Sequence, residues 1–299
     1  MQLDTRVGGK TKLTGLIGNP IEHTVSPVLH NTLFSMLGID GIYLPVKVPP
    51  GRLEEAVCGL KASGFTGFNV TIPYKEEVLR YLDEVSEEAL MLGAVNTIKI
   101  SDNRLYGCNT DGDGFLRAFA EQIGEGFEGK AVCILGAGGT ARTLSIKTAT
   151  SGARKITVIN RTPERARELS LSVNRVLEDK GFEKITDCAA LGSREAAEAI
   201  EECDVLINTT SAGMYPKVED SPLKDDFRFR KEQIIYDVIY NPAETKLLSQ
   251  AKSSGCRTAN GAGMLFYQGV RAFEIWMGMD VPDNKLRELS SEFLKYLAE

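Results

Sequence analysis

Histidine is nearly absent from this sequence of 299 residues, since it occurs only as His23 and His30. Acid–base chemistry is therefore expected from lysine, aspartate, glutamate or tyrosine. The six cysteines are scattered along the chain and form no Cys-x-x-Cys pair. We therefore expect no zinc or other metal site, and reduced thiols in a cytosolic protein are the simpler interpretation.

An excess of basic charge is also missing, because 35 Lys and Arg face 41 Asp and Glu, a formal net charge of −6. A nucleic-acid-binding protein would show a basic face, so no nucleic-acid partner is expected. No stretch approaches the roughly 18 apolar residues of a membrane helix. The amino-terminal sequence MQLDTRVGGKTK lacks the apolar core of a signal peptide. We expect a cytoplasmic protein that acts on a small molecule, and we consider a homodimer as its assembly.

Short apolar runs alternate with longer helical patterns, which is typical of an α/β protein with mostly parallel sheets. The alternation of strand-like and helical segments is interrupted near residues 110–129, where glycines cluster, and then resumes, so two domains are expected. The last two segments are purely helical. The expected strands are 13–17, 42–46, 67–70, 95–100, 105–108, 131–135, 155–159, 205–209 and 234–238. The expected helices are 27–37, 52–63, 74–81, 111–123, 140–151, 163–177, 245–254, 264–276 and 284–296.

A glycine-rich turn, Gly136-Ala137-Gly138-Gly139-Thr140-Ala141, stands between an expected strand and an expected helix. In this G-x-G-x-x-A pattern the first glycine permits the tight turn and the second lets the backbone approach a pyrophosphate. The helix N-terminus that follows would favour the negative charge. The pattern predicts dinucleotide binding, and a glycine turn with a purely structural role is the alternative.

The end of the next strand indicates which dinucleotide is bound. An NAD-binding protein usually places Asp or Glu there, whereas this chain has Asn160-Arg161-Thr162 followed by Arg165. Cations and hydroxyls suit a 2′-phosphate, which a carboxylate would repel. The sequence therefore favours NADP(H), and the alternative is that both arginines are solvated charges at a helix entry.

Polar clusters follow the expected strands of the first half, where open α/β sheets bind ligands. Ser26 is a natural N-cap before Pro27, although a hydroxyl at a helix N-terminus also suits a carboxylate ligand. Lys75 is expected in the first turn of a helix, where the macrodipole disfavours a cation and would make it a readier proton donor. A solvated surface lysine is the alternative. Asp111 is either a helix cap or the partner of such a lysine, and spacing alone does not show whether the two meet.

Together with these clusters the chain resembles the shikimate dehydrogenase family over essentially its whole length. The motifs that carry the resemblance are GNPI at 18–21, HTVSP at 23–27, NVTIPYK at 69–75, GAVNT at 93–97, NTDG at 109–112, GAGG at 136–139, NRT at 160–162, DVIYNP at 237–242 and NGAGM at 260–264, running on to Gln268.

The resemblance implies a role for each matching residue. Lys75 and Asp111 would form the catalytic pair. The substrate would be bound by Thr24, Ser26, Asn69, Thr71, Asn96, Asp111, Tyr240 and Gln268, of which Thr24, Ser26 and Tyr240 would hold its carboxylate. The cofactor NADP(H) would be bound by Gly136, Ala137, Gly138, Gly139, Thr140, Asn160, Arg161, Thr162, Arg165, Thr209, Val238 and Gly261.

The resemblance also implies the architecture and the reaction. Residues 1–110, completed by 262–299, would form the substrate-binding and catalytic domain, and residues 111–261 a Rossmann-type domain. The reaction would be the reversible reduction of 3-dehydroshikimate to shikimate by NADPH, on the pathway to chorismate and aromatic amino acids. Two rivals are a quinate/shikimate dehydrogenase that uses NAD(P) oxidatively and a non-catalytic NADP-binding regulator. Two departures from the family pattern are Thr24, where serine is commoner, and Asp113, which the sequence does not explain.

Overall fold

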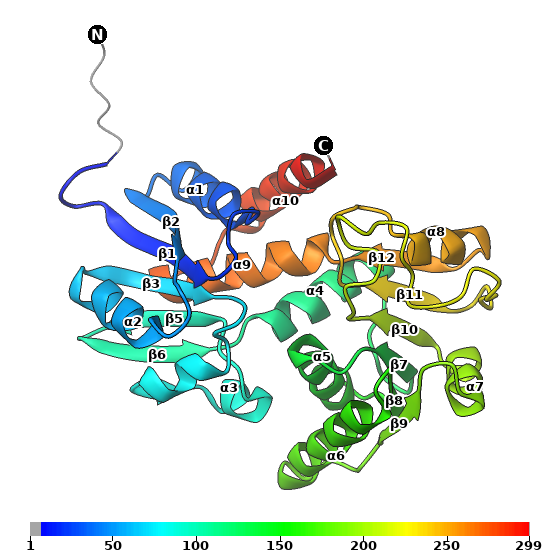
Figure 1. The fold of residues 1–299 in the computed structure, drawn as a ribbon. Helices are drawn as coiled ribbons and strands as arrows, with labels where there is room; N and C mark the ends of the chain where they lie inside the picture. Colours follow the sequence, from blue (N-terminus) through cyan, green and yellow to red (C-terminus); the bar gives the residue numbers. More distant parts are fainter. Residues whose placement is uncertain (1–6, 299) are drawn as a thin grey trace. The chain divides into compact units, whose positions relative to one another are not determined.

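The computed structural model describes residues 7–298 and divides the chain into two compact units (Figure 1). Unit 1 combines residues 7–111 with Phe266–Phe293, and unit 2 combines Gly112–Leu265 with residues 294–298. Each unit contains one six-stranded sheet. Among the described residues, no helix is long and apolar enough to cross a membrane.

The sheet of unit 1 has the strand order β2-β1-β3-β5-β6-β4. Strand β1 pairs in parallel with β2 and β3, whereas β5 runs antiparallel to both β3 and β6. The elements up to residue 108 are β1 (Lys12–Gly18), α1 (Ser26–Met36), β2 (Gly41–Lys47), α2 (Leu53–Ala62), β3 (Phe65–Val70), the 3₁₀ helix η1 (Glu77–Tyr81), β4 (Glu84–Val85), α3 (Glu87–Leu92), β5 (Thr97–Ser101) and β6 (Arg104–Cys108).

The strands expected over 95–100 and 105–108 form an antiparallel hairpin, β5 and β6. Asp102 and Asn103 at its turn have φ angles of 50° and 58°. A two-residue turn of type I′ needs positive φ at both positions, and Asn and Asp tolerate it better than other non-glycine residues. The residues at the centre therefore suit the turn.

The sheet of unit 2 has the order β12-β11-β10-β7-β8-β9, and all of its pairs are parallel. The chain leaves β7 in one direction through β8 and returns through β10 on the other side, so the strand order reverses between β7 and β10. Open α/β sheets bind ligands at the carboxyl ends of strands at such a switch point. The elements are α4 (Asp111–Ile123), β7 (Ala131–Leu135), α5 (Gly139–Thr150), β8 (Lys155–Asn160), α6 (Pro163–Asp179), β9 (Thr186–Ala190), α7 (Arg194–Glu202), β10 (Val205–Asn208), β11 (Ile234–Asp237), α8 (Lys246–Ser253) and β12 (Arg257–Asn260).

Two long helices close the chain, as predicted: α9 (Ala262–Met277) and α10 (Asp283–Ala298). The greater part of both helices belongs to unit 1. Contacts of α9 with unit 1 explain this, because Phe273 packs against Phe34 of α1 with ring centroids 5.0 Å apart and Trp276 Nε1 donates to the Ile98 carbonyl of β5 at 2.9 Å. Phe293 of α10 packs in turn on Phe266 of α9. The α/β class with mostly parallel sheets and C-terminal helices is confirmed.

Candidate active site

Lys75 lies in a turn between β3 and η1, so the helix predicted over 74–81 forms only from Glu77 on, as the short 3₁₀ helix η1, and does not include Lys75. The reason is that tertiary partners take the local polar groups. The Tyr74 hydroxyl is buried and donates to the Val48 carbonyl at 2.9 Å, and the Val95 N–H donates to the Lys75 carbonyl at 2.8 Å. The argument from a helix macrodipole at Lys75 therefore falls, while the position of its backbone is fixed by these bonds.

The structure brings Lys75 and Asp111 together, which no spacing in the sequence could show. Lys75 Nζ donates to Asp111 Oδ2 at 2.6 Å, and the side chains are 31% and 19% exposed. Asn96 Nδ2 donates to the other carboxylate oxygen, Oδ1, at 2.8 Å. An ammonium held by a half-buried carboxylate can reach a ligand while its charge and direction are controlled.

Asp111 is the first residue of α4 rather than the cap before it, so the capping alternative is wrong. Its carboxylate accepts from Lys75 and Asn96, whereas its own backbone N–H donates to Asn109 Oδ1 at 3.0 Å. Asn109 thus satisfies a backbone donor at the helix start. Because Asn109 and not the Asp111 side chain accepts from this backbone donor, the Asp111 carboxylate remains available to Lys75.

Three further predicted residues, Asn96, Gln268 and Asn69, lie beside this pair in unit 1. Asn96 is 3% exposed, and its Nδ2 also lies 3.5 Å from Gln268 Oε1 on α9. Asn69 is 6% exposed and donates from Nδ2 to the Asn96 carbonyl at 3.0 Å. The predicted residues Lys75, Asp111, Asn96, Gln268 and Asn69 therefore form one hydrogen-bonded cluster.

The hydroxyls of Thr24 and Ser26 stand at the start of α1. The N-cap is Val25, and Ser26 is the first helical residue, so the predicted N-cap at Ser26 is off by one position. Thr24 Oγ1 accepts from the Ser26 N–H at 3.3 Å and so takes over part of the capping. Thr71 is half-buried at the end of β3, and a Cβ at Gly18 would lie 2.3 Å from its Cγ2. Gly18 is therefore needed to let Thr71 occupy its place.

His30 lies behind this region, fully buried on α1, and its ring stacks on Tyr43 at 4.2 Å. Burial lowers the pKa of His30 to about 3, because an apolar surrounding disfavours the charged imidazolium. The imidazole is therefore neutral at pH 7 and part of the packing. His30 is therefore not a candidate for acid–base chemistry.

In unit 2 the glycine-rich turn connects β7 to α5 at the switch point. Gly136 has a φ angle of 109°, and a Cβ on it would lie 2.5 Å from Thr209 Oγ1. Thr209 is fixed in turn, because its Oγ1 donates to the Leu135 carbonyl at 2.7 Å. Only glycine fits at this position.

The start of α5 has the properties that a phosphate group requires. Gly138 is the N-cap, and a Cβ on Gly138 or Gly139 would meet nothing within 4 Å. No acidic residue lies in the first turn of the helix. The first N–H groups of a helix have no intrahelical acceptor, and the macrodipole favours an anion in front of them. Open space, free donors and favourable polarity therefore coincide, and the predicted residues Ala137 and Thr140 flank this cradle.

The segment after β8 offers cationic and hydroxyl groups. Asn160 Nδ2 donates to the Thr162 carbonyl at 3.1 Å, and Thr162 is the N-cap of α6 without a side-chain capping bond. Arg161 and Arg165 are exposed, and neither forms an ion pair within residues 7–298. A second helix N-terminus with two uncompensated guanidinium groups fits a phosphate dianion.

Val238 and Gly261 follow the neighbouring strands β11 and β12. A Cβ on Gly261 would lie 1.9 Å from the Val238 carbonyl oxygen, so the two backbones are in direct contact. The Val238 N–H donates to the Asn208 carbonyl at 3.0 Å. Tyr240 lies two residues further on, and burial raises the pKa of its hydroxyl. All three stand at the carboxyl edge of the sheet of unit 2.

One buried carboxylate was not assigned a role from the sequence, although the DVIYNP motif contains it. Asp237 is 0% exposed and accepts from Asn208 Nδ2 at 3.0 Å, from the Ile239 N–H at 3.1 Å and from Thr245 Oγ1 at 2.7 Å. Burial raises its pKa to about 6, against the effect of these donors. Asp237 ties the ends of β10 and β11 to the start of α8.

Asp113, which the sequence left unexplained, forms an ion pair with Lys147 of α5. The distance from Lys147 Nζ to Asp113 Oδ1 is 2.7 Å. A Cβ on Gly112 would lie 2.7 Å from Lys147 Cγ, so the lysine stem lies across this glycine. The pair therefore secures α4 against α5 within unit 2.

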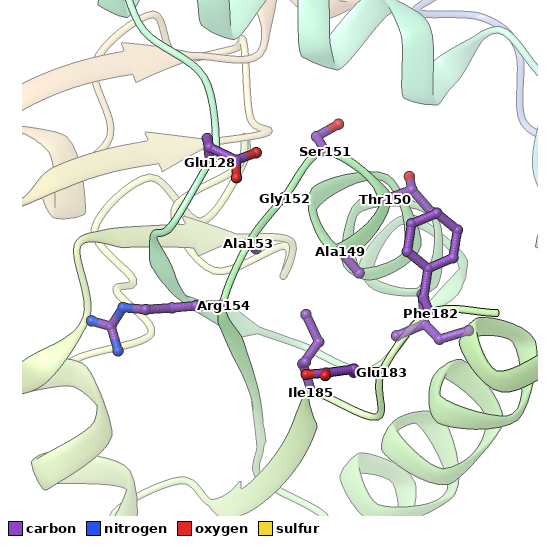
Figure 2. Close-up of a pocket in the computed structure, with 11 residues that line it drawn as sticks. Glu128, Ala149, Thr150, Ser151, Gly152, Ala153, Arg154, Phe182, Glu183 and Ile185 are labelled. Atoms are coloured by element: carbon purple, nitrogen blue, oxygen red, sulfur yellow. The ribbon is translucent and has the colours of Figure 1, made fainter. Parts of the chain in front are cut away.

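A pocket of about 580 Å³ opens at the opposite end of α5 (Figure 2). Its lining includes the last turn of α5, with Ala149 and Thr150, and the carboxylates of Glu128 and Glu183. The carboxyl end of a helix carries partial negative charge, which acidic side chains reinforce. Arg154 also lines the pocket, but it forms an ion pair with Asp204 at 3.3 Å. A phosphate is therefore disfavoured there, and none of the predicted site residues lines this pocket.

Comparisons with known proteins agree with this geometry. Three family models match: the shikimate dehydrogenase substrate binding domain at residues 16–98, shikimate/quinate 5-dehydrogenase at 118–242, and the shikimate 5′-dehydrogenase C-terminal domain at 261–289. A shikimate dehydrogenase (NADP(+)) from Moorella thermoacetica is 45% identical over 287 residues, which cover 95% of each chain.

Solved structures show the same likeness. A shikimate dehydrogenase in complex with NADP+ has a TM-score of 0.88 at 37% identity and covers 98% of each chain. A shikimate 5-dehydrogenase from Listeria monocytogenes, in complex with shikimate and NAD, has a TM-score of 0.87 at 35% identity, covering 96% of this chain and 99% of that one. The chain therefore belongs to the shikimate dehydrogenase family of oxidoreductases.

Proposed function

We propose that this chain catalyses the reversible reduction of 3-dehydroshikimate to shikimate with NADPH, and that Lys75 and Asp111 are its catalytic pair. The observation that carries the proposal is the 2.6 Å contact between Lys75 Nζ and Asp111 Oδ2 within the unit that matches the family's substrate binding domain. A non-catalytic regulator that merely kept the fold would have no need of this pair in a hydrogen-bonded cluster of polar side chains.

Unit 1 is the substrate-binding unit of this proposal. Hydroxyl and amide groups suit a polyhydroxylated ring acid, because they can donate to its carboxylate and accept from its hydroxyls. Thr24 and Ser26 hold the carboxylate at the start of α1, where the helix polarity favours an anion. Asn69, Thr71, Asn96 and Gln268 bind the ring hydroxyls, and Tyr240 reaches the carboxylate end.

Unit 2 is the cofactor-binding unit, and its residues fit NADP(H). The open backbone at Gly138 and Gly139 would hold the pyrophosphate, and Arg161 and Arg165 would hold the 2′-phosphate beside Asn160 and Thr162. Thr209, Val238 and Gly261 would border the ribose and the nicotinamide. When bound, the nicotinamide supplies or accepts the hydride of the reaction.

The ammonium of Lys75 performs the acid–base step in both directions. In reduction it donates a proton to the carbonyl oxygen of the substrate and stabilises the negative charge that develops there. In oxidation the neutral amine takes the proton back from the hydroxyl. Asp111 keeps the lysine oriented through its hydrogen bond and is itself held by Asn96.

The test is the oxidation of shikimate by NADP+, followed at the NADPH absorbance, for wild type, Lys75→Met, Asp111→Asn and the double variant. Loss of a positioned acid typically lowers the rate by about 10²–10⁴. We expect each single variant to lose kcat in this range and the double variant to lose little more, since the two groups act as a unit. NADPH affinity, measured by fluorescence titration, should change by less than about twofold.

The matched control is Lys61→Met. Lys61 is another half-buried lysine of unit 1 that pairs with an aspartate, Asp83, at 3.5 Å. It should retain the kcat of the wild type. A Lys75→Met enzyme with near-normal kcat would show that Lys75 is not the proton donor, and a wild type without activity on shikimate would refute the reaction itself.

A further inference from the structure

Thr97, the first residue of β5, is a buried hydroxyl with three polar neighbours and no assigned role. It is 0% exposed, so it does not touch a ligand. Its Oγ1 accepts from Asn69 Nδ2 at 3.0 Å, donates to Asn96 Oδ1 at 2.9 Å and lies 3.2 Å from Thr110 Oγ1. Thr97 therefore stands between the two asparagine amides of the proposed substrate site.

The directions of these hydrogen bonds are fixed by a group that can only accept. Asn69 Nδ2 lies 3.0 Å from the backbone carbonyl of Asn96, so the amino end of the Asn69 amide must point toward β5. Its second N–H then donates to Thr97 Oγ1, and the single hydroxyl proton of Thr97 is left for Asn96 Oδ1. The backbone N–H of Thr110 also donates to Asn96 Oδ1, at 2.8 Å, so the amide of Asn96 presents Nδ2 to Asp111 Oδ1 at 2.8 Å.

The far end of this chain of bonds is Tyr43. Tyr43 is 1% exposed, and its hydroxyl donates to Asn69 Oδ1 at 2.9 Å. Burial raises the pKa of Tyr43, so the hydroxyl keeps its proton and remains a donor. Every donor from Tyr43 through Asn69, Thr97 and Asn96 therefore points toward the carboxylate of Asp111.

We propose that Thr97 is a positioning residue of the active site, whose hydroxyl links the amides of Asn69 and Asn96 and so fixes the place from which Asn96 Nδ2 donates to Asp111. This inference rests on the proposed function, since it concerns the same catalytic pair. Without the hydroxyl, an N–H of Asn69 loses its acceptor and Asn96 Oδ1 loses a donor in a buried place. The Asn96 carbonyl and the Thr110 N–H still set the directions of the two amides, but both side chains can shift, and the bond from Asn96 Nδ2 to Asp111 Oδ1 is then weakened.

The experiment compares Thr97→Val, Thr97→Ser and wild type in shikimate oxidation, with NADPH affinity and Tm measured in parallel. Valine keeps the shape of threonine and removes the hydroxyl, whereas serine keeps the hydroxyl and removes a methyl group. A displacement of reacting groups by about 1 Å can lower the rate by about a hundredfold. We expect Thr97→Val to lose about 10- to 100-fold in kcat/KM for shikimate, with most of the loss in kcat, and Thr97→Ser to stay within about threefold.

The order of the two variants separates positioning from packing. A residue that matters only for packing would tolerate valine better than serine, and its variants would lose Tm rather than kcat. Wild-type kcat in Thr97→Val, or a lower kcat in Thr97→Ser than in Thr97→Val, overturns the proposal. NADPH affinity should stay within about twofold of wild type in both variants, because the phosphate cradle lies in unit 2.

A variant at the end of the chain decides the question if Thr97→Val does not fold. Tyr43→Phe removes only the terminal donor and keeps the ring, and we expect a loss of about 3- to 10-fold in kcat/KM for shikimate. An unchanged value would overturn the proposal. A wild type that does not oxidise shikimate would instead refute the proposed function, so the two failures are distinguishable.

Discussion

Asp237 allows a sharp prediction about stability, because its carboxylate is buried in unit 2 and its pKa is raised to about 6 by that burial. The perturbation is Asp237→Asn, which removes the charge and keeps the shape. Three donors, from Asn208, Ile239 and Thr245, surround the carboxylate. The amide oxygen of asparagine can accept from some of these donors, and the Thr245 hydroxyl can turn to accept from the new amino group.

The sign follows from the direction of the pKa change. Between the ordinary value of 3.8 and about 6, the folded protein keeps a proton that the unfolded chain releases. The free energy of unfolding of the wild type therefore falls as the pH rises through this interval. The interval corresponds to about 3 kcal/mol. Asparagine is neutral in both the folded and the unfolded state, so the free energy of unfolding of the variant does not fall in this way as the pH rises.

We expect the free energy of unfolding of Asp237→Asn relative to wild type to rise by about 2.4 kcal/mol between pH 4 and pH 7, since part of the full difference is already lost at pH 4. Any change in hydrogen bonding that the asparagine causes is present at every pH. It therefore adds the same amount at each pH to the difference in free energy of unfolding between variant and wild type. Urea unfolding followed by circular dichroism at pH 4, 5, 6 and 7 measures it, with the exposed Asp179→Asn as a control. A difference between variant and wild type that is the same at pH 4 and pH 7 would refute the reasoning.

Three other predictions concern ligands. Replacing Arg161 and Arg165 with glutamine should raise KM for NADP+ by about a hundredfold and leave KM for NAD+ nearly unchanged. The reason is that each charge-assisted bond to the 2′-phosphate contributes about 1.5–3 kcal/mol. Equal use of both cofactors by the wild type would contradict this. The kcat/KM for shikimate should exceed that for quinate by about 10- to 100-fold, because the Thr24 methyl overpacks against quinate. Thr24→Ser should reduce this difference in kcat/KM. Comparable values for both acids in the wild type would favour a quinate/shikimate dehydrogenase. Gly136→Ala should weaken NADPH binding at least about tenfold in a fluorescence titration, since its Cβ would lie 2.5 Å from Thr209 Oγ1, and unchanged affinity would contradict the close contact.

Elements with a strong apolar pattern were predictable from the sequence. The helix over 111–123 and the strand over 131–135 have the bounds that the pattern predicted, because each buries an apolar set with the matching period. Strands β9 and β12 were missed, since each lies at an edge of its sheet and has few apolar residues. Helix α7 was missed too, because glutamates and alanines dominate its sequence.

The candidate site could be predicted as a set of residues but not as a geometry. Motifs indicated Lys75 and Asp111, which are 36 positions apart and meet only through the fold. Among the supporting side chains, Tyr43 gave no signal, since it is an ordinary strand aromatic. Thr97 stands in the GAVNT motif, but the sequence assigned it no role until its buried hydroxyl was placed beside Asn69.

The turn that carries Lys75 has a consequence for the entropy of substrate binding. Ordering a flexible loop around a ligand would require about 1–2 kcal/mol per residue of backbone. Here the Lys75 carbonyl already accepts from Val95, and the neighbouring Tyr74 is buried. Only the methylene torsions of one lysine remain to be ordered, about 2 kcal/mol at most, and the bond to Asp111 has already restricted them. The proposed proton donor therefore lies on a backbone that hydrogen bonds already hold, so little of the binding free energy of a substrate is needed to order it.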